Sequence, residues 1–226
     1  MMTNIFYEKE TIFEKTSKLI KESINKTLMI KDKIILGLPG GRNISSILNQ
    51  LKKETIDWKK VHVFMVDERL VPIDSPDSNY HLIKKCLSDI IPVDNLHPFI
   101  FDEGKLNYSL EKYQQEIENF GGVYDIVLLS SGEDGHIGSL FPNHPSIHDN
   151  SDFFILIENS PKPPKNRMGI SKNFLLKSKI GLIFFIGDTK REAYVKFLDN
   201  NIGYENCPAK FISNLPESYV LTNIKI

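Results

Sequence analysis

Four short runs of apolar residues, mostly β-branched or aromatic, constrain the fold of this chain more than any other feature. They cover residues 34–38, 61–66, 126–129 and 180–186. Such runs lack the alternation of a half-exposed strand and are typical of strands that are buried on both faces. We therefore predict a mostly parallel sheet whose two faces are both covered by helices.

Helices are predicted between these strands from apolar spacing and from capping residues. The first is an amphipathic helix marked by Ile12, Thr16, Leu19, Ile20 and Ile24. The others cover residues 44–53, residues 79–89 behind a Ser78 N-cap, residues 110–119 behind Ser109, and residues 189–198 behind Asp188. This alternation predicts one doubly wound α/β domain over residues 1–226, with ligands bound at the carboxyl ends of its strands.

The charge balance excludes several classes of partner. The chain has 28 Lys and Arg against 29 Asp and Glu, a net charge of -1, so it lacks the basic surplus typical of proteins that bind nucleic-acid phosphates or anionic membranes. We expect no nucleic-acid or membrane partner, and an anionic ligand would be bound by local groups. No apolar run is long enough to span a bilayer, and residues 1–10 lack the pattern of a signal peptide. With only Cys86 and Cys207 and no disulfide framework, these features favour a cytoplasmic protein with reduced thiols.

The first two apolar runs are followed by groups suited to ligand binding. After residue 38, the paired glycines Gly40 and Gly41 let backbone N–H groups approach a ligand at a helix N-terminus, which favours a phosphate, and Arg42 adds a positive charge. A plain strand-to-helix turn is the alternative. The second run leads directly into Asp67, Glu68 and Arg69, although an ion pair at a solvated strand exit would give the same pattern.

The third run leads into a loop with reactive side chains. In residues 130–142, His136 follows Asp134 by two positions, and an imidazole beside a carboxylate can act as a general base near neutral pH. Further cations lie in the Pro-rich residues 160–167, which include Arg167, and at Lys190. Rigid cationic loops lose little entropy when they bind an anion, but solvated surface charges are the alternative.

Other chemistries have weaker support. The sequence has no G-x-S-x-G motif for a serine nucleophile, and neither cysteine lies in a motif loop. His144 and His148 have the spacing of metal ligands on a helix, but Pro142 and Pro145 oppose a helix there, and no H-E-x-x-H motif is present. We therefore predict neither a covalent intermediate nor a metal.

Taken in chain order, these motifs resemble those of the 6-phosphogluconolactonase family, within the wider group of glucosamine-6-phosphate isomerases and deaminases. The resemblance covers nearly the whole chain, through Gly-Gly at 40–41, Asp-Glu-Arg at 67–69 with Val-Pro at 71–72 and Ser-Asn at 78–79, Asp-Gly-His at 134–136 with Ser-Leu-Phe-Pro at 139–142, Ser-Pro-Lys-Pro-Pro at 160–164 with Arg167, and Gly187 with Lys190. It implies a Rossmann-like sugar-phosphate isomerase/lactonase fold. It also implies hydrolysis of 6-phosphoglucono-δ-lactone to 6-phosphogluconate, the second step of the oxidative pentose phosphate pathway, without a cofactor.

The resemblance also implies roles for single residues. His136 resembles the family's water-activating base, with Asp134 and Asp67 as supporting carboxylates. The residues that resemble its phosphate and substrate contacts are Gly40, Gly41, Arg69, Arg167 and Lys190.

The chain departs from the family pattern in two loops. The family's first loop usually surrounds its glycines with Ser or Thr and ends in Thr-Pro, whereas this chain has Pro39, Arg42, Asn43 and Ile44. We predict that Arg42 substitutes for the missing hydroxyl donors. The family also usually has Leu-Gly-x-Gly before Asp-Gly-His, where this chain has Ser130, Ser131 and Gly132. These substitutions leave open a slightly different position for that loop.

Two alternatives to the lactonase are considered. Amino-sugar-phosphate isomerases typically continue after Asp-Gly-His into Asn-Glu-Pro, whereas this chain continues into Ser-Leu-Phe-Pro at 139–142 and so lacks their acid-base Glu. A non-catalytic sugar-phosphate sensor would keep the phosphate contacts and could lose the base. The presence of both Asp134 and His136, without a DNA-binding segment, favours the enzyme.

Overall fold

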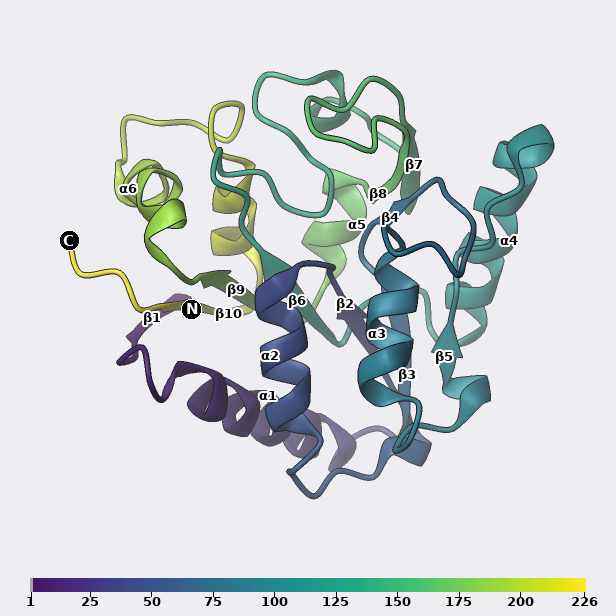
Figure 1. Cartoon of the computed structure of the whole chain (residues 1–226), viewed down its shortest axis with the longest axis horizontal. Helices are drawn as coiled ribbons and strands as arrows, with labels where there is room; N and C mark the ends of the chain where they lie inside the picture. The colour runs from purple at the N-terminus through teal and green to yellow at the C-terminus, as the bar shows by residue number, and fades with distance from the viewer. Residues whose placement is uncertain (1) are drawn as a thin grey trace.

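The computed structural model describes residues 2–226, apart from the side chain of Asn4. At its centre is a seven-stranded sheet with the order β1-β10-β9-β6-β2-β3-β5, whose neighbouring strands all run parallel (Figure 1). The strands are β1 (Met2–Phe6), β2 (Ile34–Leu38), β3 (Val61–Met65), β5 (Leu96–His97), β6 (Ile126–Ser130), β9 (Ile180–Phe185) and β10 (Glu217–Thr222). The four predicted strands are β2, β3, β6 and β9, and every residue of β2, β3 and β9 is buried.

Helices cover both faces of this sheet. On one face α1 (Ile12–Leu28), α2 (Arg42–Leu51) and α3 (Asn79–Leu87) pack side by side (Figure 1). On the other face α4 (Leu106–Asn119) and α5 (Lys172–Lys177) are linked by ring contacts through Phe154, and the 3-10 segment η6 (Pro208–Asn214) packs against α5. The remaining helix, α6 (Arg191–Leu198), contacts β9. The predicted doubly wound α/β fold is therefore confirmed.

Capping residues were predicted correctly at one helix and wrongly at two others. The Ser78 hydroxyl accepts a hydrogen bond from the His81 N–H at 3.1 Å and caps α3 as predicted. Ser109 does not cap α4, because this helix begins three residues earlier, at Leu106, after the 3-10 turn η3 (Glu103–Lys105). Asp188 does not cap α6, because the chain first makes the 3-10 turn η5 (Asp188–Lys190), closed by the Lys190 N–H on the Gly187 carbonyl.

A second, antiparallel sheet was not predicted. It has the order β4-β8-β7 and consists of β4 (Glu68–Arg69), β8 (Arg167–Ile170) and β7 (Phe154–Ile157). In its register Arg69 pairs with Arg167. This small sheet therefore joins the Asp-Glu-Arg motif to the Pro-rich cationic segment, although about 100 residues separate them in the sequence.

The order of the strands creates a switch point beside β2. From β2 the chain proceeds to β3 and β5 on one side, and β6 and β9 lie on the other side. The two directions leave a crevice at the carboxyl ends of β2 and β6, where ligands bind in folds of this type. The segments that directly follow β2, β3, β6 and β9 contain all of the predicted site residues except Arg167.

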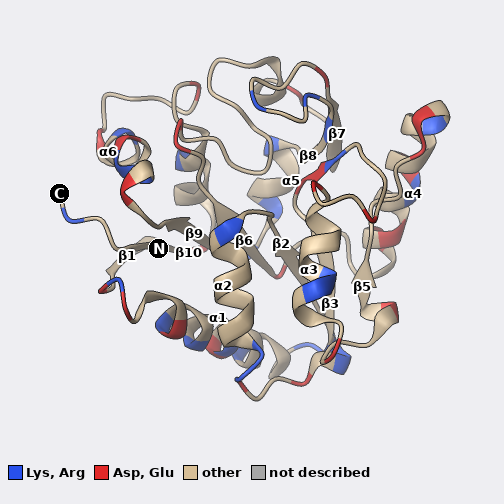
Figure 2. Cartoon of the chain, viewed as in Figure 1, with Lys and Arg blue, Asp and Glu red and all other residues tan. Residues whose placement is uncertain are grey.

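Two surface properties bear on possible partners. Segments with Lys and Arg and segments with Asp and Glu both occur across the whole structure, and neither sign is confined to one part of it (Figure 2). Within residues 2–226, no helix is both long and apolar enough to cross a membrane. Cys86 and Cys207 are free and buried.

Candidate active site

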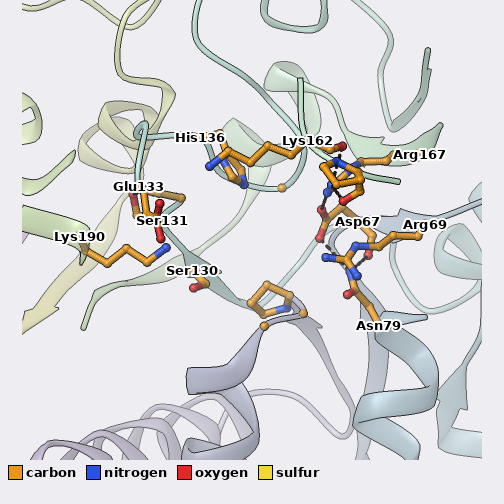
Figure 3. Close-up of a pocket in the computed structure, with 16 residues that line it drawn as sticks. Asp67, Arg69, Asn79, Ser130, Ser131, Glu133, His136, Lys162, Arg167 and Lys190 are labelled. Atoms are coloured by element: carbon orange, nitrogen blue, oxygen red, sulfur yellow. Dashed lines mark hydrogen bonds and ion pairs between the residues drawn. The ribbon is translucent and has the colours of Figure 1, made fainter. Parts of the chain in front are cut away.

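A pocket of about 270 Å³ lies at the carboxyl ends of the central strands. Seven of the nine predicted site residues line it, namely Gly40, Gly41, Asp67, Arg69, His136, Arg167 and Lys190. Figure 3 shows Lys190, Glu133 and Ser130 along one side of the pocket and Asp67, Arg69 and Arg167 along the other. The two predicted site residues that do not line the pocket are Asp134, which is hydrogen-bonded to His136, and Arg42, which is exposed.

Asp134 and His136 form a hydrogen-bonded pair at the edge of the pocket. The Nδ1 atom of His136 is 2.6 Å from Oδ1 of Asp134, and a carboxylate can only accept, so Nδ1 carries the proton. The imidazole ring also packs on Phe141, with 4.7 Å between ring centroids. Within the described residues Nε2 has no hydrogen-bond partner, so this atom is available to a water or a substrate.

The charge of Asp134 is stabilised from two sides. Burial raises the pKa of Asp134, but the hydrogen bonds and charge of His136 and the charge of Lys162 outweigh it and hold the pKa well below its usual range. The Lys162 ammonium lies 3.6 Å from the second carboxylate oxygen, Oδ2. Asp134 therefore stays ionised at neutral pH and stabilises positive charge on His136.

Gly132 leaves the space that this pair occupies. A Cβ atom at this position would collide with both the His136 ring and the Asp134 carboxylate. The loop also closes on itself, because the Gly132 N–H donates to the His136 carbonyl at 2.8 Å. The packing of His136 and Asp134 therefore requires a glycine at position 132, which the sequence alone did not show.

Asp67 is held by three residues from different parts of the chain. Its Oδ2 accepts a hydrogen bond from the Ser139 hydroxyl at 2.6 Å and lies 3.9 Å from Nη1 of Arg167. The amide of Asn79 donates to the Asp67 carbonyl at 2.8 Å and to Oδ1 at 3.3 Å. With 8% of its surface exposed, Asp67 is a fixed carboxylate in the wall of the pocket, opposite Lys190.

Glu68 has a structural role that the sequence analysis did not assign. This residue is 2% exposed, and its carboxylate accepts hydrogen bonds at 2.7 Å from the N–H groups of Arg69, Asn79 and Tyr80. It also accepts one from the Ser78 hydroxyl at 3.0 Å. Glu68 therefore caps the N-terminus of α3, where a carboxylate is favoured, and fixes Asn79 and Arg69 beside the pocket. The solvated strand exit considered for this motif is not found.

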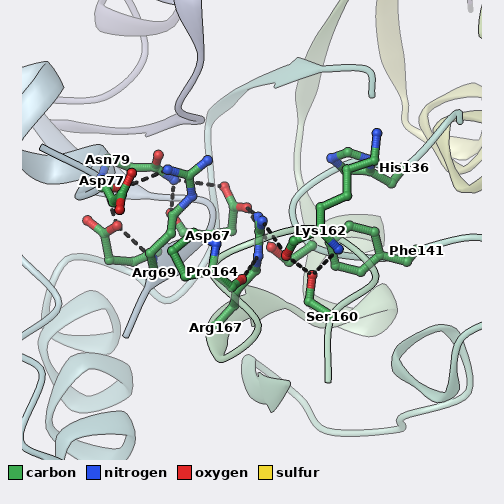
Figure 4. A network of polar contacts seen from close by, with 12 residues as sticks. Asp67, Arg69, Asp77, Asn79, His136, Phe141, Ser160, Lys162, Pro164 and Arg167 are labelled. Carbon is green, nitrogen blue, oxygen red and sulfur yellow. Dashed lines mark hydrogen bonds and ion pairs between the residues drawn. The ribbon is translucent and has the colours of Figure 1, made fainter. Parts of the chain in front are cut away.

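The two arginines on this side of the pocket differ in their freedom. Three hydrogen bonds at 3.1–3.2 Å join the buried Arg167 guanidinium to the carbonyls of Lys162, Pro163 and Pro164 (Figure 4). Arg167 thereby fixes the loop that carries Lys162. Arg69 donates from Nη1 to the Asp77 carbonyl at 2.6 Å, while its buried Nε–H has no partner within the described residues. The guanidinium of Arg69 thus lines the pocket with one buried donor left unsatisfied.

Lys190 lines the pocket without a carboxylate partner for its positive charge within the described residues. Burial lowers its pKa, and the charges of Glu133 and Asp134 partly oppose this effect. The charge of Arg42 acts in the same direction as burial. No carboxylate within residues 2–226 forms an ion pair with Lys190, so an anion entering the pocket would meet a partly desolvated, unpaired ammonium.

The loop after β2 presents its backbone to the pocket. Gly40 packs against the Asn79 side chain, and Gly41 has φ 108°, a conformation that glycine adopts without strain. Gly41 is the N-cap residue of α2 and provides no side-chain cap, which leaves N–H groups of the first turn for a ligand. Asn43, one of the departures from the family pattern, instead donates to the Ile186 carbonyl at 3.1 Å.

Lys162 and Asn79 are two of the lining residues that were not among the predicted site residues. Lys162 belongs to the predicted cationic segment 160–167 without a role of its own there, yet it contacts Asp134. Lys165, in the same segment, is exposed and outside the pocket. Asn79 appeared only as part of a motif. The described residues contain no group of three or more His, Cys, Asp or Glu side chains that could hold a metal ion.

Comparison with known proteins identifies the family. Residues 7–220 match the model of the family described as glucosamine-6-phosphate isomerases/6-phosphogluconolactonase. The chain belongs to this family. A 6-phosphogluconolactonase of Borreliella burgdorferi is similar to it, with 33% identity over 202 residues and 86% of each chain covered. The resemblance to 6-phosphogluconolactonases, predicted from the motifs, is therefore confirmed, and with it the prediction of an enzyme of this type.

Solved structures of the isomerase and lactonase family share the fold of the whole chain. The crystal structure of 6-phosphogluconolactonase from Thermotoga maritima superimposes with a TM-score of 0.85 and 25% identity, covering 98% of this chain and 99% of that one. A monomeric glucosamine-6-phosphate deaminase superimposes with a TM-score of 0.80 and 21% identity, covering 98% and 96%. At this lower identity the likeness shows the fold alone, so it does not distinguish between the two reactions of the family.

Proposed function

We propose that this chain hydrolyses 6-phospho-D-glucono-1,5-lactone to 6-phospho-D-gluconate in the oxidative pentose phosphate pathway. The observation that carries this proposal is the pairing of Asp134 with Nδ1 of His136, which leaves Nε2 as a base at a pocket that also holds the unpaired cation Lys190. The similarity to 6-phosphogluconolactonases supports the same reaction. No cofactor is needed for it.

The phosphate group is assigned to the side of the pocket that carries Lys190. A phosphate here would neutralise the partly desolvated ammonium and accept hydrogen bonds from the backbone at Gly40 and Gly41. The opposite side contains the Asp67 carboxylate, which would repel a dianion but can accept hydrogen bonds from sugar hydroxyls. Arg42 acts at the rim as a long-range charge, so its direct contact with phosphate stays a prediction.

His136 is assigned the role of the base. A water bound at Nε2 attacks C1 of the lactone, Nε2 takes its proton, and the carboxylate of Asp134 stabilises the resulting imidazolium. A tetrahedral intermediate forms with negative charge on the former carbonyl oxygen, which the guanidinium of Arg69 in the wall of the pocket can stabilise. The bond from C1 to the ring oxygen then breaks, and the imidazolium returns its proton to that oxygen. The products are a carboxyl group and a free hydroxyl.

Asp67 and Arg167 are assigned positioning roles in this scheme. Arg167 fixes the backbone of the Lys162 loop, and Asp67 is held by Asn79 and Ser139 at the sugar-binding side. Arg167 has no atom that can accept a proton, and both carboxylate oxygens of Asp67 already accept hydrogen bonds. Nε2 of His136 is therefore the better-placed base.

The decisive experiment is acid release from freshly generated 6-phosphogluconolactone, measured above the spontaneous rate with purified protein. The proposal predicts acceleration with this substrate, a much smaller kcat/KM for unphosphorylated gluconolactone, and no ammonia from glucosamine 6-phosphate. No acceleration, combined with calorimetric binding of 6-phosphogluconate, would instead support the sugar-phosphate sensor. Ammonia release would support the deaminase.

A further inference from the structure

The pocket-lining loop after β2 supplies no side-chain hydroxyl. Pro39 has no donor, Asn43 uses its amide on the Ile186 carbonyl, and Arg42 does not line the pocket. Only the backbone of this loop faces the proposed phosphate. A phosphate has three acceptor oxygens, so side-chain donors from another element are needed to complete its coordination.

Three serines lie in or behind the wall of the pocket, and two of them are already bonded. The Ser131 hydroxyl donates to the Gly132 carbonyl at 2.9 Å, and the Ser139 hydroxyl donates to Asp67 at 2.6 Å. The Ser130 hydroxyl has no hydrogen-bond partner in the chain from residue 2 to residue 226, although Ser130 lines the pocket and is half-buried. It is therefore the serine donor that remains for a ligand.

The position of Ser130 places this hydroxyl opposite the loop after β2. Ser130 is the last residue of β6, the strand paired with β2 at the switch point. Its Oγ lies 4.0 Å from the place that a Cβ atom would take on Gly41. Figure 3 shows Ser130 on the same side of the pocket as Lys190, away from Asp67.

We infer that the Ser130 hydroxyl donates a hydrogen bond to the phosphate of the substrate and contributes to the preference for phosphorylated lactones. This inference rests on the proposed function and adds a specificity-determining residue to it. The hydroxyl donor missing from the loop after β2 is thus supplied by the neighbouring strand, together with the backbone at Gly41 and the ammonium of Lys190. Ser130 takes no part in the chemical step.

The test compares Ser130→Ala, Ser130→Thr and the parent with phosphorylated and unphosphorylated lactones. A hydrogen bond to a charged group predicts that Ser130→Ala raises KM for the phosphorylated lactone and the Kd of 6-phosphogluconate about tenfold, with kcat within about twofold. Ser130→Thr keeps the hydroxyl and should restore both values. The kcat/KM for the unphosphorylated lactone should be the same in all three proteins. Ser46→Ala, in α2 and outside the pocket, is the matched control.

Two results would overturn the assignment of Ser130. One is an unchanged KM and Kd in Ser130→Ala. The other is a large fall in kcat with KM unchanged, which would make Ser130 part of the chemistry. Calorimetric titration with 6-phosphogluconate does not depend on turnover, so it tests Ser130 even if the parent proves inactive on the lactone. Failure of the proposed function and failure of this inference are therefore distinguishable.

Discussion

Replacing Gly132 by Ala should displace the proposed base without removing any functional side chain. The added Cβ would collide with the His136 ring and the Asp134 carboxylate, whereas ordinary contacts of a Cβ begin at 3.4 Å. Relief of this overlap requires the ring to move by about 1 Å, and a displacement of this size costs about 10² in rate. Because positioned general-base catalysis is worth about 10² to 10⁴, we expect kcat to fall by a factor within that range.

The assay for Gly132→Ala is acid release at saturating substrate, together with calorimetric binding of 6-phosphogluconate. Binding should change little, because the groups assigned to the phosphate, at Gly41, Ser130 and Lys190, are not among the atoms that the added Cβ would meet. Overpacking should also cost about 1–3 kcal/mol of stability, so a thermal melt must show that the variant is folded at the assay temperature. Gly203→Ala is the control, because a Cβ there meets open space. A folded Gly132→Ala variant with kcat within about threefold of the parent would refute the role assigned to His136.

Three further predictions follow from the same contacts. Asp134→Asn should reduce the free energy of unfolding at neutral pH, because the pKa of Asp134 is held below its usual range in the folded protein. The difference from the parent should shrink as pH falls below about 4, and urea unfolding at several pH values would show it. Glu68→Gln replaces one oxygen that accepts two hydrogen bonds and should cost about 2 kcal/mol in the same assay; an unchanged midpoint would mean that α3 does not depend on this cap. Lys190→Met keeps the apolar stem but removes the charge, so KM for the phosphorylated lactone should rise by about one to two decades; equal KM values would place the phosphate elsewhere.

The sequence predicted the parts of the fold that depend on local pattern. The continuous apolar runs at β2, β3, β6 and β9 are long enough to mark strands buried on both faces. The polar residues directly after them therefore pointed to the carboxyl edge of the sheet. In the central sheet, the strands missed were β1, β5 and β10, which are short or carry polar residues such as Glu217 and Ser218, so their apolar pattern is weak.

The rest of the site depends on contacts between distant segments. The three-stranded sheet joins Arg69 to Arg167, and no local signal at either residue predicts this pairing. The contact of Arg167 with phosphate stays a prediction, but no pattern in the sequence indicated that its guanidinium donates to backbone carbonyls of its own loop. The cap provided by Glu68 and the space left by Gly132 likewise arise only when separate turns pack together.

The central claim, that Nε2 of His136 activates the attacking water, is tested most directly by kcat of His136→Asn across pH. The Asn amide can still donate to Asp134, but it cannot take a proton. We expect kcat to fall by about 10² to 10⁴, with the Kd of 6-phosphogluconate within about threefold of the parent. The substrate phosphate also titrates near pH 6, so the acid limb of the parent must be compared with that of the variant. Near-parental kcat in His136→Asn, with the same acid limb, would contradict the account and transfer the role of the base to Asp67 or Asp134.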